Sequence, residues 1–130
     1  MNHVYEITAI NEFSSAHLIE GIEGPCSRLH GHNWKIEVTI LCKKLDQIGF
    51  SVDFYWLENL IKEQIITPLD HRYINELDHF HGINPTCENI AKWCFNRLKD
   101  KICALEYTSL KKVALWENNK FKITVTEDKA

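Results

Sequence analysis

The most regular pattern of apolar and polar residues lies between Asn33 and Cys42. Apolar side chains occupy every second position of this segment, at Trp34, Ile36, Val38, Ile40 and Cys42. Successive side chains of a strand point to opposite faces, so a period of two is typical of a strand with one buried face. The segment therefore predicts a half-buried strand.

A preceding strand is expected over Val4–Leu18, which is rich in β-branched and aromatic residues. Its alternation slips around Asn11–Glu12, which we interpret as a bulge or a bend. The segment Gly21–Pro25 then supplies residues that form tight turns. Together these features predict an antiparallel pair of strands.

The pattern changes to a helical period after Phe54. Apolar residues recur there at helical spacing, at Leu57, Leu60, Ile61 and Ile65, and Pro68 is expected to stop the helix. A second helix is expected to begin at Asn84–Thr86, where Asn or Thr can cap and Pro fits the first turn. Its apolar residues continue to Leu98.

The C-terminal segment returns to a period of two. Val113, Leu115 and Glu117 share one face, and a second run from Phe121 to Val125 follows the Asn118–Asn119 turn. The order β-β-α-α-β-β predicts an α+β fold, a four-stranded antiparallel sheet with both helices packed on one face. Such a sheet has two open edges, which neighbouring subunits can close.

Length and charge narrow the class of protein. A chain of 130 residues with 45% hydrophobic residues can bury one core, so we expect a single domain over residues 1–130. The 15 Lys and Arg and the 18 Asp and Glu residues are scattered, and the net charge of -3 argues against nucleic acid as a partner.

The sequence also predicts the compartment. No signal peptide pattern begins the chain, and no stretch approaches the roughly 18 apolar residues that span a bilayer. The five cysteines include no C-x-x-C pair, which favours reduced thiols. We therefore expect a cytoplasmic protein with no membrane partner.

The candidate metal ligands are His17, His30 and His32. Residues two apart in an extended chain point to the same side, so His30 and His32 present their imidazoles together. If the first two strands pair as a hairpin, His17 comes close to both. Three neutral imidazoles with an open fourth position are typical of a catalytic Zn²⁺ site, whereas Mg²⁺ and Ca²⁺ prefer oxygen ligands.

An H-x-H pair is weak evidence by itself, because surface or core histidines satisfied by hydrogen bonds produce the same pattern. A second such pair, His79 and His81, lies in a polar stretch with no strand period behind it. We interpret this second pair as part of a solvated loop.

Three further positions carry reactive side chains. Cys26 precedes His30 by four residues, and its thiol is a base or nucleophile, a fourth zinc ligand or an inert turn residue. The adjacent Asp70 and His71 can form an acid–base pair, although two surface residues are the alternative. Glu117 faces the buried side of its strand and needs a partner, such as the forked N–H edge of a pterin or guanine.

Six blocks of residues occur in the order and spacing of a known family, namely Phe13–His17, Cys26 with His30–His32, Val52–Phe54, Leu69–Asn75, Asn84–Ala91 and Trp116–Glu117. On these blocks, over nearly its whole length, the chain resembles the 6-pyruvoyl-tetrahydropterin synthase family. That family includes the 6-carboxytetrahydropterin synthases of queuosine synthesis.

The resemblance implies a role for each matching position. By this resemblance His17, His30 and His32 bind zinc, Cys26 is the catalytic thiol, and Asp70 with His71 is the general acid–base pair. Glu117 anchors the pterin ring, and Thr86 and Glu88 help to form its pocket. The resemblance further implies a tunnelling fold, in which sheets of several subunits join into a barrel, and a homohexamer built as a dimer of trimers.

The resemblance also implies a reaction. Three residues separate Cys26 from His30, as in the carboxy-forming branch, whereas the pyruvoyl-forming branch has a longer gap. The implied activity is a lyase that converts 7,8-dihydroneopterin triphosphate to 6-carboxy-5,6,7,8-tetrahydropterin, acetaldehyde and triphosphate. One departure is Asn118–Phe121, where the family usually has Thr and a short Gly- or Ala-containing stretch.

Three alternatives remain open at this point. The first is a 6-pyruvoyl-tetrahydropterin synthase that eliminates triphosphate, and the second is a pterin-binding module without turnover. The third is a protein in which zinc is purely structural, which would need a closed site of four ligands.

Overall fold

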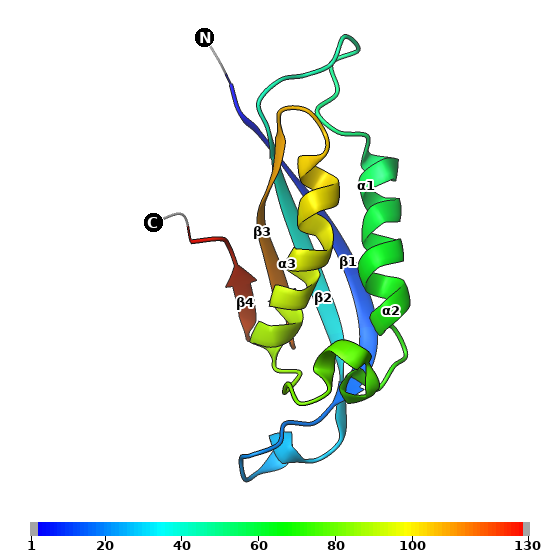
Figure 1. The fold of residues 1–130 in the computed structure, drawn as a ribbon, viewed down its shortest axis with the longest axis vertical. Helices are drawn as coiled ribbons and strands as arrows, with labels where there is room; N and C mark the ends of the chain where they lie inside the picture. The colour runs from blue at the N-terminus through cyan, green and yellow to red at the C-terminus, as the bar shows by residue number, and fades with distance from the viewer. Residues whose placement is uncertain (1–2, 129–130) are drawn as a thin grey trace.

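The computed structural model describes residues 3–128, which form an antiparallel sheet of four strands with helices on one face (Figure 1). The sheet consists of β1 (Tyr5–His17), β2 (His30–Cys42), β3 (Thr108–Trp116) and β4 (Lys122–Val125), hydrogen-bonded in that order. The predicted α+β fold is thereby confirmed. The expected domain also takes in residues 1–2 and 129–130, which lie outside the described residues.

The pairing of β1 with β2 is continuous from Tyr5 opposite Cys42 to His17 opposite His30. The bulge predicted at Asn11–Glu12 is therefore wrong. The slip in the pattern has another cause, because polar Asn11 is on the inner face of β1 while Ile10, on the outer face, is exposed. A register shift does occur, but between β2 and β3, at Thr39/Ile40.

The first helical run begins with α1 (Phe54–Ile61), whose N-terminus is capped by the Asp53 carboxylate accepting from Tyr55 N at 2.9 Å. A π-helical turn, η2 (Lys62–Ile66), and a short α2 (Thr67–Leu69) continue it. The run ends at Leu69, one residue after Pro68, so the predicted stop is confirmed to within one residue.

The second helix, α3 (Cys87–Cys103), begins where the sequence predicts and runs beyond Leu98. Thr86 caps it by accepting a hydrogen bond from Asn89 N at 3.1 Å. Short 3-10 turns connect the larger elements, at η1 (Pro25–Ser27), η3 (Ile74–Glu76) and η4 (Asp78–Phe80).

The core lies between the sheet and the helices. Figure 1 shows α1 and α3 in front of the same face of the sheet, as predicted. The apolar residues of β2 that follow the period of two are fully buried there, at Trp34, Ile36, Val38 and Ile40. The end of β1, the start of β2 and the start of α3 meet at the lower end of the sheet in this view. None of the helices formed by residues 3–128 has the length and apolar character needed to cross a bilayer.

Candidate metal centre

The pairing of β1 and β2 brings three histidine rings together. His17 is directly opposite His30, and His32 is opposite Ser15, two residues before His17. The ring centroids of His17 and His30 are 4.5 Å apart, those of His30 and His32 4.8 Å, and those of His17 and His32 5.2 Å. The side chains that the sequence singled out as candidate ligands are thus clustered in the structure.

Backbone carbonyls orient two of these rings. His17 Nδ1 lies 2.7 Å from the carbonyl oxygen of Pro85, and His30 Nδ1 lies 2.7 Å from that of Arg28. A carbonyl only accepts hydrogen bonds, so each Nδ1 carries the proton and each Nε2 presents a lone pair. Metal-binding histidines are characteristically held in this way.

Burial favours the neutral form of two of these imidazoles. It is the main cause that lowers the pKa of both His17 and His32, while the Glu117 carboxylate opposes the shift at each. Within the described residues, Nε2 of His17 and Nε2 of His32 are buried without a hydrogen-bond partner. Trp34 packs edge-on against both rings and closes the apolar side of the cluster. Buried lone pairs without a partner are what a metal ion would satisfy.

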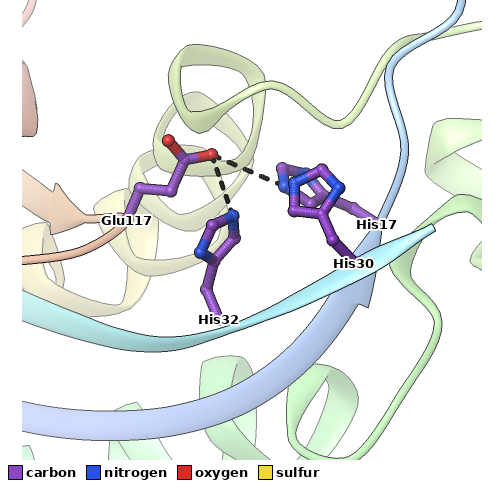
Figure 2. A group of neighbouring side chains, drawn as sticks. All are labelled: His17, His30, His32 and Glu117. Atoms are coloured by element: carbon purple, nitrogen blue, oxygen red, sulfur yellow. Dashed lines mark ion pairs between the residues drawn. The ribbon is translucent and has the colours of Figure 1, made fainter. Parts of the chain in front are cut away.

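Glu117 completes the cluster from a different part of the chain. It follows directly after β3, and Figure 2 shows its carboxylate pointing toward the histidines. Glu117 Oε1 is 3.5 Å from Nε2 of His17 and 3.5 Å from Nε2 of His32. The sequence analysis predicted that the Glu117 carboxylate needs a partner. Among the described residues, that partner is the histidine cluster.

The donor atoms suit a zinc ion. One ligand atom from each of His17, His30, His32 and Glu117 lies within 4.8 Å of the others. Bonds of about 2.0–2.1 Å in a tetrahedron place neighbouring ligand atoms about 3.4 Å apart. The carboxylate-to-imidazole distances are already close to that value, and small side-chain rotations would close the others. Imidazole with one carboxylate is a donor set that zinc accepts.

Cys26 is not part of this cluster. It lies in η1, its side chain is exposed, and among the described residues the group of possible ligands holds the three histidines and Glu117. Its backbone carbonyl accepts a hydrogen bond from Ile19 N at 2.8 Å, which ties its loop to the chain just after β1. The geometry gives no support to Cys26 as a fourth metal ligand.

Two asparagines to which sequence reasoning gave no role at the site hold the chain after His17. The Asn75 amide accepts from Leu18 N and donates to Leu18 O, both at 3.0 Å. The Asn84 amide bonds Glu20 in the same way, at 2.9 and 2.8 Å. Both residues lie inside blocks that carry the family resemblance, but their task emerges only from the fold. They extend the edge of β1 and so fix His17.

Asp70 and His71 form a pair at the edge of β1. Asp70 Oδ2 is 2.9 Å from His71 Nδ1, while Asp70 Oδ1 accepts from Ser14 N at 2.9 Å. The hydrogen bond from Ser14, followed by that from His71, lowers the pKa of Asp70. His71 has a φ of 59°, a left-handed conformation that costs free energy in a residue with a side chain. Its amide, donating to Ser14 O at 2.6 Å, helps to hold it there.

This pair lies outside the histidine cluster. The His71 side chain is 82% exposed, and neither His71 nor Asp70 belongs to the group of possible ligands in residues 3–128. The structure therefore forms the predicted acid–base pair but does not bring it to the histidines of the same chain.

Thr86 and Glu88 lie at the start of α3. The Thr86 hydroxyl is engaged in capping, and Glu88 is exposed in the first turn. Between them, burial raises the pKa of the Cys87 thiol to about 12, with the charges of Glu117 and Glu88 adding to the effect. Cys87 is thus a neutral thiol, and its Sγ donates to Leu115 O at 3.4 Å.

The second H-x-H pair behaves as predicted for a solvated loop. His79 lies in η4 and His81 directly after it, and both side chains are exposed, whereas Phe80 between them is buried. This contrast supplies matched control positions for the histidines of the cluster.

Known proteins with similar sequences and folds include several pterin enzymes. The sequence profile of the 6-pyruvoyl tetrahydropterin synthase family matches residues 6–128. A 6-carboxy-5,6,7,8-tetrahydropterin synthase of Haemophilus influenzae is 32% identical over 135 residues, covering 88% of this chain and 93% of that protein. A dihydroneopterin monophosphate aldolase of Pyrococcus furiosus is 33% identical over 113 residues, covering 85% and 88%. The 6-pyruvoyl tetrahydropterin synthase of Caenorhabditis elegans has the same fold, with a TM-score of 0.84 at 24% identity and 97% coverage of both chains.

Proposed function

The chain belongs to the 6-pyruvoyl tetrahydropterin synthase family, and from this premise we propose that it is a zinc-dependent lyase acting on 7,8-dihydroneopterin triphosphate. The reaction consumes one water and yields 6-carboxy-5,6,7,8-tetrahydropterin, acetaldehyde and triphosphate. The observation that carries the proposal is the convergence of His17, His30 and His32, each with one ligand atom in a group within 4.8 Å. The 6-carboxy-5,6,7,8-tetrahydropterin synthase among its relatives supports the choice of product.

The proposed roles follow the chemistry of each side chain. Zinc held by the three histidines would supply Lewis-acid stabilisation of negative charge developing on substrate oxygens. The side chains of Cys26 and of His71, the latter oriented by Asp70, move protons on and off the substrate. Glu117 accepts the forked N–H groups of the pterin ring and so orients the side chain.

The pterin ring itself would lie near the start of α3. Thr86 and Glu88 border this place, and the carbonyl of neighbouring Pro85 holds His17. A ring bound here by Glu117 has its substituent beside the histidines, because the same carboxylate is 3.5 Å from two of them.

Other fates of the side chain are the main alternatives. Carbon–carbon cleavage is favoured because one relative at 33% identity is a dihydroneopterin monophosphate aldolase. Elimination of triphosphate to a pyruvoyl product remains the second candidate, since the Caenorhabditis elegans protein with the same fold is a 6-pyruvoyl tetrahydropterin synthase. If the zinc were purely structural, the protein would catalyse neither carbon–carbon cleavage nor elimination of triphosphate.

We expect the zinc-loaded protein to release one acetaldehyde for each 7,8-dihydroneopterin triphosphate that it consumes. Trapping acetaldehyde as a hydrazone, with chromatography of the pterins, measures both quantities. Consumption of the pterin without acetaldehyde, together with a pyruvoyl product, would replace the carboxy assignment by the second candidate. An aldolase would instead leave a two-carbon aldehyde that still carries the triphosphate. No consumption at all would favour a binding module or a structural zinc.

We further propose a homohexamer, or at least a trimer, with active sites at the subunit boundaries. Strands β1 and β4 each pair with one neighbouring strand in the sheet. The segment 70–73 bonds the outer edge of β1 from Ser14 to Ala16, so the part of that edge before Ser14 and the outer edge of β4 are the edges that we expect another subunit to pair with. Asp70 and His71 lie at the β1 edge, with the His71 side chain exposed and outside the group of possible ligands in residues 3–128. An assembled ring would bring this pair to the histidine cluster of a neighbouring subunit.

Mixing two inactive variants tests this assembly. Cys26→Ala and His71→Ala subunits should be coexpressed with different tags and purified through both tags. About a quarter of the boundary sites should then be active, because each site takes an intact Cys26 from one subunit and an intact His71 from the other, each with a chance of about one half. Each variant alone should stay inactive. Mixed oligomers without recovered activity would place both groups in one subunit's site, and a monomer in light scattering would contradict the assembly itself.

The proposed location is the cytoplasm, which suits the free thiols of Cys26, Cys42, Cys87, Cys94 and Cys103. The proposed product would serve the synthesis of queuosine and related 7-deazapurines.

A further inference from the structure

Glu117 faces two demands that it cannot meet at the same time. The proposed function assigns its carboxylate to the pterin ring, yet in the structure the same carboxylate lies against the histidine cluster (Figure 2). We propose that Glu117 is the fourth ligand of the metal when no substrate is bound, and that it leaves the metal when it binds the ring. This inference rests on the proposed function for the identity of the ring and the ion.

The distances place Glu117 Oε1 where a fourth ligand belongs. It is equally far, 3.5 Å, from Nε2 of His17 and from Nε2 of His32. Ligand atoms at about 2.0–2.1 Å from a tetrahedral ion are about 3.4 Å apart. Both histidines expose unpartnered lone pairs to the same point, within the part of the chain that the structure describes. Neutral imidazoles give a neighbouring carboxylate little electrostatic stabilisation unless a cation lies between them.

The backbone that carries Glu117 is held firmly. Glu117 N donates to Phe121 O at 3.3 Å across the turn, and the Asn118 side chain accepts from the amides of Lys120 and Phe121. On the preceding residue, Trp116 Nε1 donates to Glu37 at 2.6 Å. The exchange is therefore a movement of the Glu117 side chain alone.

The side chain is free to make this movement. Glu117 is 29% exposed, whereas His17 beside it is 1% exposed, so the carboxylate lies at the open side of the cluster. A forked contact with the two N–H groups of a pterin uses both carboxylate oxygens. Once Oε1 is engaged in that contact, it is withdrawn from the histidines. Recognition of the ring and opening of the fourth position are then one event.

This exchange has a consequence for selectivity. A ligand without the forked N–H edge leaves Glu117 on the metal, and the fourth position stays closed to its hydroxyls. Sugars and other polyols would therefore not reach the metal, whereas pterins would.

Metal binding tests the first half of the proposal. Zinc affinity, measured by competition with a chromophoric chelator, should fall by at least about tenfold in Glu117→Gln, because outer-shell changes alone cost about 10–100-fold and a ligand is lost here. Glu58→Gln, an exposed change on α1, is the matched control and should bind zinc as the wild type does. Glu117→Asp keeps the charge but shortens the reach, and should resemble Glu117→Gln.

Cobalt substitution tests the exchange itself. The visible bands of Co²⁺ report its ligands, so Glu117→Gln should alter the wild-type spectrum and Glu58→Gln should not. Unsubstituted pterin, which has the ring donors but no side-chain hydroxyls, should shift the wild-type spectrum toward that of Glu117→Gln. The same pterin should leave the Glu117→Gln spectrum unchanged.

The outcomes separate this inference from the proposed function. Identical zinc affinity and cobalt spectra in wild type and Glu117→Gln would overturn the fourth ligand even if acetaldehyde is released normally. A changed Glu117→Gln spectrum with no response of the wild type to pterin would keep the ligand but overturn the exchange. Failure of the proposed function appears elsewhere, as absence of turnover by the zinc-loaded wild type.

Discussion

Replacing His32 by Ala is expected to remove the metal from the protein. The wild type should carry about one zinc per chain, and His32→Ala should carry almost none after dialysis. His32 supplies one of three imidazoles and cannot be replaced by a neighbour, because Ser15 stands opposite it on β1. Loss of an outer-shell partner already costs about 10–100-fold in affinity, so loss of the ligand itself should exceed about 100-fold. Elemental analysis and chelator competition measure the effect.

The second H-x-H pair gives the control for this experiment. His81→Ala removes an exposed imidazole from the loop after η4 and should leave the zinc content unchanged. Circular dichroism of His32→Ala separates loss of metal from loss of fold. Full zinc in a folded His32→Ala variant would show that the ion, if bound, is held elsewhere, and the metal assignment would have to be abandoned.

Replacing Cys26 by Ala is expected to abolish turnover and to leave the metal in place. The thiol is exposed in η1 and lies outside the group of His17, His30, His32 and Glu117 among the described residues. Deletion of a general base typically lowers kcat by roughly 10²- to 10⁴-fold. Zinc content and pterin affinity should stay close to the wild-type values, so the loss should appear in kcat and not in binding.

Cys103→Ala is the matched control, because Cys103 is also a free and exposed cysteine, at the end of α3. It should be fully active. If Cys26→Ala lost its zinc, the thiol would have to be reassigned as a ligand. If it kept its activity, Cys26 would be an inert turn residue, and the proton transfers would fall to the Asp70–His71 pair.

The main strands and helices, and the faces on which the histidines lie, could be predicted from local patterns in the sequence. The period of two in β2 places His30 and His32 on the buried side with Trp34, and the parity of β1 does the same for His17. Thr86 as the cap of α3 was also readable, because its hydroxyl can accept a hydrogen bond from an amide of the first turn. Such features depend on residues that are close in the chain. The chemistry of the side chains and the local period of apolar residues are sufficient to predict them.

Which of these groups come into contact follows from the folded chain and could not be predicted from local patterns. Glu117 reaches the histidines because β3 pairs with β2 in one register, shifted at Thr39/Ile40, and that register involves residues about eighty positions apart. The carbonyl of Pro85, which orients His17, has no signature in the sequence, since every residue carries such a carbonyl. The Asp70–His71 pair could be recognised from its residues, but its position at the β1 edge follows from hydrogen bonds to Ser14 that no periodicity encodes. Local patterns specify the face of each strand, whereas the assembly of a site depends on long-range register and backbone contacts.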